Sequence, residues 1–172
     1  MLYLLDANVL IDANRDYYPI TRVPEFWGWL LEMGKNGHVR IPIEVYEEIK
    51  EGTYREDEED KDKVKFTDWA KNSETETVLL LNEEVDVALV AQIVDKGYAP
   101  DLTDDEVEKI GRDPFLVAYG LKDKNNRCLV TTEVSRPSKQ RANRKLPDVC
   151  KDFGVSCCNT FKFTKELNFS TK

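Results

Sequence analysis

Short apolar runs that resemble β-strands alternate along this chain with longer segments whose apolar residues recur at helical spacing. Parallel strands are joined by long crossovers, usually helices, so this alternation predicts a parallel sheet with helices on its faces. We therefore expect an α/β fold, a three-layer α/β/α sandwich with a parallel sheet of roughly four to five strands. The predicted strands span residues 3–5, 38–43, 127–132 and 155–161.

The segments between these runs carry recognisable helix boundaries. Residues 82–97 begin with Asn, continue with acids and end with Gly, which predicts one long helix. The sequence TDDE at 103–106 is a capping box and predicts the start of a short helix. Further helices are expected just after Asp6 and over 24–34, 42–52, 113–121 and 146–154, with an exposed loop or helix end over 54–63. The length of 172 residues favours a single domain, residues 1–172.

The chain as a whole is acidic, but one segment is basic. Lys and Arg number 25 against 33 Asp and Glu, giving a formal net charge of −8, whereas residues 121–172 hold 12 basic and 5 acidic side chains. Many of these basic residues lie in RPSKQRANRK, residues 136–145. This polar stretch is either a solvated loop or an arm that binds RNA phosphates through Arg136, Lys139, Arg141, Arg144 and Lys145.

Several classes of protein are disfavoured by what the sequence contains. No apolar run approaches the ~20 residues that would span a bilayer, and the N-terminus resembles no secretion signal, so we expect a cytoplasmic protein without membrane contact. The four cysteines lack CxxC spacing and are expected to be reduced and mostly buried rather than bound to zinc. The only histidine, His38, begins a predicted strand, and no nucleophile elbow is visible, which argues against serine or cysteine hydrolysis.

Four acidic residues stand where strands end or helices begin. Asp6 follows the first strand, Glu133 follows the third, Glu48 lies on the helix after the second, and Asp113 precedes Pro114. A local role is the alternative for each, as an Asx turn or N-cap for Asp6 and Asp113 and as a solvated helix surface for Glu48. Together, the four carboxylates would converge at one edge of a parallel sheet, where their repulsion favours a hard divalent cation.

The stretches LLDANVLID, EVYEEI, DPFLVAYGL and LVTTE, in that order, resemble the motif series of the PIN domain. The PIN domain is a metal-dependent ribonuclease fold found in VapC-type toxins of bacterial and archaeal toxin–antitoxin systems. The resemblance runs from Leu2 to about Phe161. It implies two groups of site residues: catalytic acids that hold Mg²⁺ or Mn²⁺ at Asp6, Glu48, Asp113 and Glu133, and supporting polar residues at Asn8 and Thr131.

By this resemblance, the chain is expected to be a divalent-metal-dependent endoribonuclease, in which an activated water attacks an RNA phosphodiester bond in line. A cognate antitoxin and a second copy of the chain are the protein partners that it implies. Among the helix acids, Glu48 matches the family position, although Glu44 shares its helix face. Two features depart from the family pattern: the fourth acid is often Asp, and additional residues fall in 52–82 and 136–146.

Other functions fit parts of the same pattern. A non-catalytic PIN-fold protein would act through protein contacts alone, and a housekeeping RNA-processing nuclease would use the same acids without an antitoxin. A haloacid-dehalogenase-type phosphatase also begins with a strand ending in Asp, but it needs a second Asp two positions later, where this chain has Asn8. A response-regulator receiver needs an acidic pair after its first strand, and LLDAN offers one acid.

Overall fold

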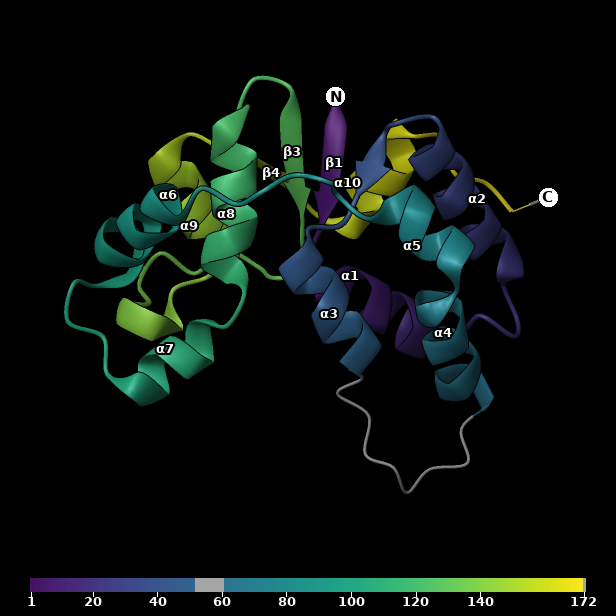
Figure 1. The fold of residues 1–172 in the computed structure, drawn as a ribbon, viewed down its shortest axis with the longest axis horizontal. Helices are drawn as coiled ribbons and strands as arrows, with labels where there is room; N and C mark the ends of the chain where they lie inside the picture. The colour runs from purple at the N-terminus through teal and green to yellow at the C-terminus, as the bar shows by residue number, and fades with distance from the viewer. Residues whose placement is uncertain (52–60, 172) are drawn as a thin grey trace.

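The computed structural model describes residues 1–51 and 61–171. Across these residues, four parallel strands form one sheet in the order β2-β1-β3-β4 (Figure 1). The strands are β1 (Leu2–Leu5), β2 (Val39–Arg40), β3 (Arg127–Val130) and β4 (Ser156–Cys158). An isolated parallel bridge between Ile41 and Leu80 extends the β2 edge. The expected α/β fold with a parallel sheet is confirmed.

The strands divide the interior into two hydrophobic clusters, one on each face of the sheet. In β1, Tyr3 and Leu5 lie in the first cluster, whereas Leu4 between them lies in the second. In β3, Leu129 lies in the second cluster while its neighbours lie in the first. This alternation follows from the two-residue period of a strand, and burial on both faces explains why the two central strands are mostly apolar, with Arg127 at the start of β3 as the charged exception.

The helices form the two outer layers of the sandwich (Figure 1). The first cluster is covered by α1 (Ala7–Asp12), α2 (Pro24–Lys35), α3 (Ile43–Glu51), α4 (Lys61–Lys71), α5 (Ser73–Leu79) and α10 (Thr160–Glu166). The second cluster is covered by α6 (Val87–Ile93), α7 (Asp104–Ile110), α8 (Asp113–Lys122) and α9 (Leu146–Phe153). Short turns of other helical types are η1 (Ala13–Tyr17), η2 (Val94–Tyr98) and η3 (Arg141–Asn143).

Some predicted helix boundaries are correct because they depend on local capping. Thr103 caps α7 in a complete capping box with Glu106, as the sequence predicted. Gly154 adopts a left-handed conformation with φ of 67° just after α9, which Gly tolerates without steric cost. The helix expected over 24–34 is α2, and it runs through Gly34 instead of ending there.

The long helix expected over 82–97 is wrong in its first five residues. The helix α6 begins at Val87, and Asp86 caps it by accepting hydrogen bonds from the backbone N–H groups of Ala88 and Leu89. Glu83 lies outside the helix, because its carboxylate pairs with Arg127 at 2.6 Å. One of the acids that suggested a helical first turn thus takes part in a tertiary ion pair, and another, Asp86, is the N-cap. The helices α4, α5 and α10 were not predicted from the sequence.

Residues 54–60 of the charged run lie outside the described residues, and Lys61–Lys63 begin α4.

Within the described part of the chain, none of the helices combines the length and the apolar character that crossing a bilayer requires.

Candidate functional site

A cavity of about 370 Å³ opens at the carboxyl ends of β1 and β3. Strand β1 lies in the middle of the sheet, with β2 on one side and β3 on the other, so neighbouring connections diverge there. Open parallel sheets bind ligands at such switch points. The cavity is lined by four acids predicted from sequence, Asp6, Glu48, Asp113 and Glu133, together with Asn8, Val45, Glu51, Glu108, Lys109, Ile110, Gly111, Arg112 and Leu116.

Asp6 is the buried acid at the base of this cavity, and only 7% of its surface is exposed. Its backbone N–H donates to the Val130 carbonyl at 3.0 Å, which extends the β1–β3 pairing by one residue. The Thr131 hydroxyl donates to Asp6 Oδ2 at 2.8 Å. Asp6 occupies the N-cap position of α1, but it makes no side-chain capping hydrogen bond. Its carboxylate lines the cavity, and the nearby backbone N–H of Asn8 in the first turn of α1 lowers its pKa.

Asp113 comes from the opposite helical layer. It is the first residue of α8, and Arg112 occupies the N-cap position, so the alternative role of Asp113 as an N-cap is wrong by one residue. The Tyr98 hydroxyl donates to Asp113 Oδ2 across a long 3.4 Å contact. Asp113 lines the same cavity as Asp6, and Tyr98 contacts it from the side of a second, neighbouring cavity.

The third acid of the cavity comes from α3, and the structure distinguishes Glu48 from the neighbouring Glu44. Glu48 lines the cavity, as does Glu51 one helical turn further on. Glu44 does not line it, because its Oε1 accepts a 3.5 Å hydrogen bond from the Tyr119 hydroxyl. Glu48 and Glu44 are four residues apart, so the sequence alone placed them on one face.

Glu133 differs from the other three acids in having strong partners of its own. Lys145 donates to Glu133 Oε1 at 2.5 Å, and the backbone N–H of Leu146 donates to Oε2 at 2.7 Å. The Glu133 backbone N–H donates in turn to the Thr131 hydroxyl at 3.1 Å. Glu133 thus reaches the cavity wall while it also holds the start of α9.

The acids raise one another's pKa. Burial raises the pKa of Asp6 to about 6, and the charges of Glu48 and Glu133 contribute to the shift. Burial also raises the pKa of Asp113 well above its usual range, with further contributions from the charges of Asp6 and Glu133. The pKa of Glu48 is raised by burial too, partly offset by Arg112. Like charges at close range disfavour joint ionisation, so a bound cation would relieve this cluster.

The carboxylate oxygens suit a hard divalent cation such as Mg²⁺ or Mn²⁺ in their chemistry. In the described residues, however, no group of three or more His, Cys, Asp or Glu side chains forms a ready-made metal centre. The four acids surround one space without meeting at a single point. Mg²⁺ normally retains several water ligands, so acids that share one cavity can act partly through those waters.

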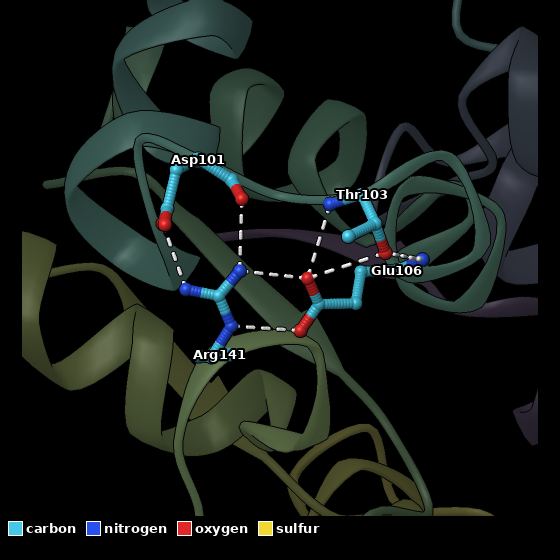
Figure 2. A network of polar contacts seen from close by, with 4 residues as sticks. All are labelled: Asp101, Thr103, Glu106 and Arg141. Carbon is cyan, nitrogen blue, oxygen red and sulfur yellow. Dashed lines mark hydrogen bonds and ion pairs between the residues drawn. The ribbon is translucent and has the colours of Figure 1, made fainter.

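The basic stretch 136–145 is held by the fold at three of its five cationic side chains. Arg141 binds Glu106 through two nitrogens and also binds Asp101, in the network of Figure 2. Arg144 donates to the Gly97 carbonyl at 2.6 Å, and it also pairs with Asp152. Lys145 pairs with Glu133. These residues, expected to contact RNA, each have a partner within the protein.

The side chains of Arg136 and Lys139, in contrast, are not held by other residues of the described chain. Both are exposed, and neither side chain has a hydrogen bond or ion pair among the described residues. They line a second cavity of about 300 Å³ that shares Lys109, Ile110, Asp113 and Glu133 with the acidic one. The acidic and basic cavities are therefore contiguous.

Sequence reasoning did not identify two basic residues of the acidic cavity, Lys109 and Arg112. Both flank Gly111, and the capping box at Thr103 did predict a helix that ends there. The predicted end of this helix near Gly111 therefore indicated that Lys109 and Arg112 lie close to Asp113. That their side chains line the acidic cavity depends on how α7 packs, which cannot be predicted from local sequence.

All four cysteines are free thiols, and three of them are buried, as expected. The pKa of the Cys150 thiol is raised chiefly by its contact with Cys157 and by burial. Among the described residues, no cysteine lines the acidic cavity.

A family model described as a domain of unknown function, DUF4411, matches residues 3–171. The chain belongs to this family. The DUF4411 match spans both hydrophobic clusters and every acid of the cavity. No curated protein and no solved structure matches the chain. The chemistry of a DUF4411 site must therefore be argued from its own residues.

Proposed function

We propose that this DUF4411 protein is a divalent-metal-dependent endoribonuclease of the PIN type, which hydrolyses RNA phosphodiester bonds. One observation carries the proposal: four acids from separate parts of the chain line a single cavity at the switch point of a parallel sheet. Their order along the chain matches the motif series that the sequence resembles. The charged, polar side chains of the lining suit hydrolysis of a charged substrate.

Asp6 and Asp113 are the acids that would hold Mg²⁺ or Mn²⁺ most directly, since both line the cavity and a cation would relieve the repulsion between their charges. Glu48 and Glu133 would complete the site or hold water molecules. Such a cation, when bound, lowers the pKa of the attacking water and offsets charge on the leaving oxygen. Thr131 would keep Asp6 in place, and Asn8 would contribute a polar contact at the cavity mouth.

The test is cleavage of a labelled RNA by purified protein with Mg²⁺, with Mn²⁺ or with EDTA. We expect metal-dependent cleavage that falls by roughly 100-fold or more in Asp6→Asn and Asp113→Asn. Asp95→Asn is the matched control, because Asp95 is exposed on η2 and lines neither cavity. Cleavage that persists in EDTA, or in both site variants, would reject the proposal.

We further propose that the nuclease acts as the toxin of a type II toxin–antitoxin pair, a role supported by the VapC-like motif order. Inducible expression should arrest growth, and Asp6→Asn should abolish that arrest. Co-expression of a neighbouring small DNA-binding protein should relieve it by binding the nuclease. Unimpaired growth with an active nuclease would instead favour a housekeeping RNA-processing role, which uses the same acids.

A further inference from the structure

The cavity beside the acids has the opposite charge character. The acidic cavity is lined by six carboxylates and two cations, whereas the second cavity is lined by five cations and two carboxylates. The two share Asp113 and Glu133 on their common wall. A single ligand that spans both would therefore meet an acidic end suited to a metal and a basic end suited to an anion.

The basic cavity is built by the fold and does not depend on a free arm. Arg141 ties η3 to α7 through the bidentate contact with Glu106, as Figure 2 shows. Arg141 keeps a φ of 52° in this arrangement, an uncommon value for a residue other than Gly. At the other end of the stretch, buried Asp148 accepts hydrogen bonds from the Ser135 hydroxyl at 2.5 Å and the Arg136 backbone at 2.7 Å.

These contacts decide which cations can serve a ligand. Arg144 and Lys145 are already in ion pairs. Lys109 donates one hydrogen bond, to Asn143 Oδ1 at 2.7 Å, and an ammonium group has three N–H donors. Arg136 and Lys139 have no side-chain partner among the described residues, although they line the cavity. Two cations with free donors and a third with spare donors thus surround one space.

We propose that this basic cavity, lined by Lys109, Arg136 and Lys139, is a phosphate-binding subsite for the nucleic-acid strand. It rests on the proposed nuclease function, and it assigns to these residues the phosphate group next to the one that is hydrolysed. Guanidinium and ammonium donors form strong charge-assisted hydrogen bonds with phosphate oxygens. Arg141 and Arg144 then act as supports of the cavity wall and not as RNA contacts.

The direct test measures binding of inorganic phosphate by calorimetry, with no metal present. The Arg136→Ala, Lys139→Ala double variant should bind phosphate at least about tenfold more weakly than wild type, because the substitutions remove two charge-assisted hydrogen-bond donors. The backbone N–H of residue 136 still reaches Asp148, so the loop should keep its place. The control Lys151→Ala, Lys165→Ala removes the same charge from exposed positions outside both cavities and should bind normally.

A second experiment distinguishes an internal phosphodiester from a terminal phosphate as the group that the subsite binds. It measures the affinity for two short oligoribonucleotides, identical except that one ends in a 5′-hydroxyl and the other in a 5′-phosphate. The protein carries Asp6→Asn and the buffer contains EDTA, so that the RNA is not cleaved. Weaker binding of both oligonucleotides by the double variant assigns the subsite to an internal phosphodiester. A loss confined to the 5′-phosphorylated one assigns it to a terminal phosphate. For each RNA phosphate that the double variant no longer neutralises, the dependence of log affinity on log salt should flatten by roughly 0.7.

Different results would overturn the proposed phosphate subsite and the proposed nuclease function. If wild-type protein binds no inorganic phosphate, or if the double variant and its control bind phosphate and both oligonucleotides alike, the subsite is overturned even when RNA is cleaved. If phosphate binding behaves as expected but metal-dependent cleavage is absent, the subsite stands and the nuclease assignment fails.

Discussion

The Thr131 hydroxyl donates a 2.8 Å hydrogen bond to the buried carboxylate of Asp6, across 125 residues of sequence. The same hydroxyl oxygen accepts the backbone N–H of Glu133. Thr131 therefore joins the first and fourth acids of the cavity, and only 1% of its surface is exposed.

Replacing Thr131 by Val should destabilise the protein by about 1–3 kcal/mol, because it leaves the Asp6 carboxylate without its side-chain donor. Thr131→Ser keeps the hydroxyl and should lie much closer to wild type. Urea denaturation at pH 7.5 in EDTA measures both. Equal losses in the two variants would show that the methyl group contributes as much as the hydroxyl, and a loss in Thr131→Ser alone would contradict the role given to the hydroxyl.

Replacing Asp6 by Asn should stabilise the metal-free protein above pH 6. The folded-state pKa of Asp6 is about 6 against an ordinary value of 3.8, so the native state binds the Asp6 proton more tightly than the unfolded state does. Ionisation therefore destabilises the native state as pH rises from about 4 to 6. The rise of the Asp6 pKa from 3.8 to about 6 corresponds to about 3 kcal/mol, by which the free energy of unfolding of Asp6→Asn should exceed that of wild type at pH 7.5, and this difference should vanish near pH 4.

Thermal and urea unfolding in EDTA, measured from pH 4 to 8, check this dependence, and Asp95→Asn serves as the exposed control. Added Mg²⁺ should narrow the gap at pH 7.5 by stabilising wild type alone, since ligands that bind only the native state raise its stability. A constant difference between Asp6→Asn and wild type across this pH range would contradict the burial-raised pKa.

Glu48→Gln should reduce RNA cleavage by roughly 100-fold, whereas Glu44→Gln should stay within a few-fold of wild type. Glu48 lines the acidic cavity, and Glu44 is directed to the Tyr119 hydroxyl instead. The two variants make the same chemical change on the same helix face, so each controls for the other. Loss of cleavage in Glu44→Gln alone would show that the active acid of α3 is Glu44, one helical turn before Glu48.

Lys145→Ala should raise the affinity for Mg²⁺ by roughly three- to tenfold, a coupling of about 1 kcal/mol, because it removes the cation that pairs with Glu133. In the Glu133→Gln background the same substitution should have little effect. Calorimetric titration of the four proteins gives a double-mutant cycle. Equal effects of Lys145→Ala in both backgrounds would exclude Glu133 from the metal site.

The sequence by itself determined the layered α/β architecture and the order of the acids. Alternating strand-like and helical runs required a parallel sheet, and the acids at strand ends then had to meet at one edge. The α7 capping box was also readable, because Thr103 and Glu106 interact within one helical turn. These features depend on periodicity and on neighbours close in sequence, so they can be predicted without the fold.

Only the tertiary structure decided which charged residues remain available to a ligand. The side chains of Arg141 and Arg136 belong to the same basic stretch, yet Arg141 is held by Glu106, 35 residues away, and Arg136 is left facing a cavity. Glu83, predicted to lie in a helix, is likewise paired with Arg127, 44 residues away, and lies outside α6. Such partners are set by how packed helices and strands align, because Coulomb and hydrogen-bond energies depend on distance in space and not on distance along the chain.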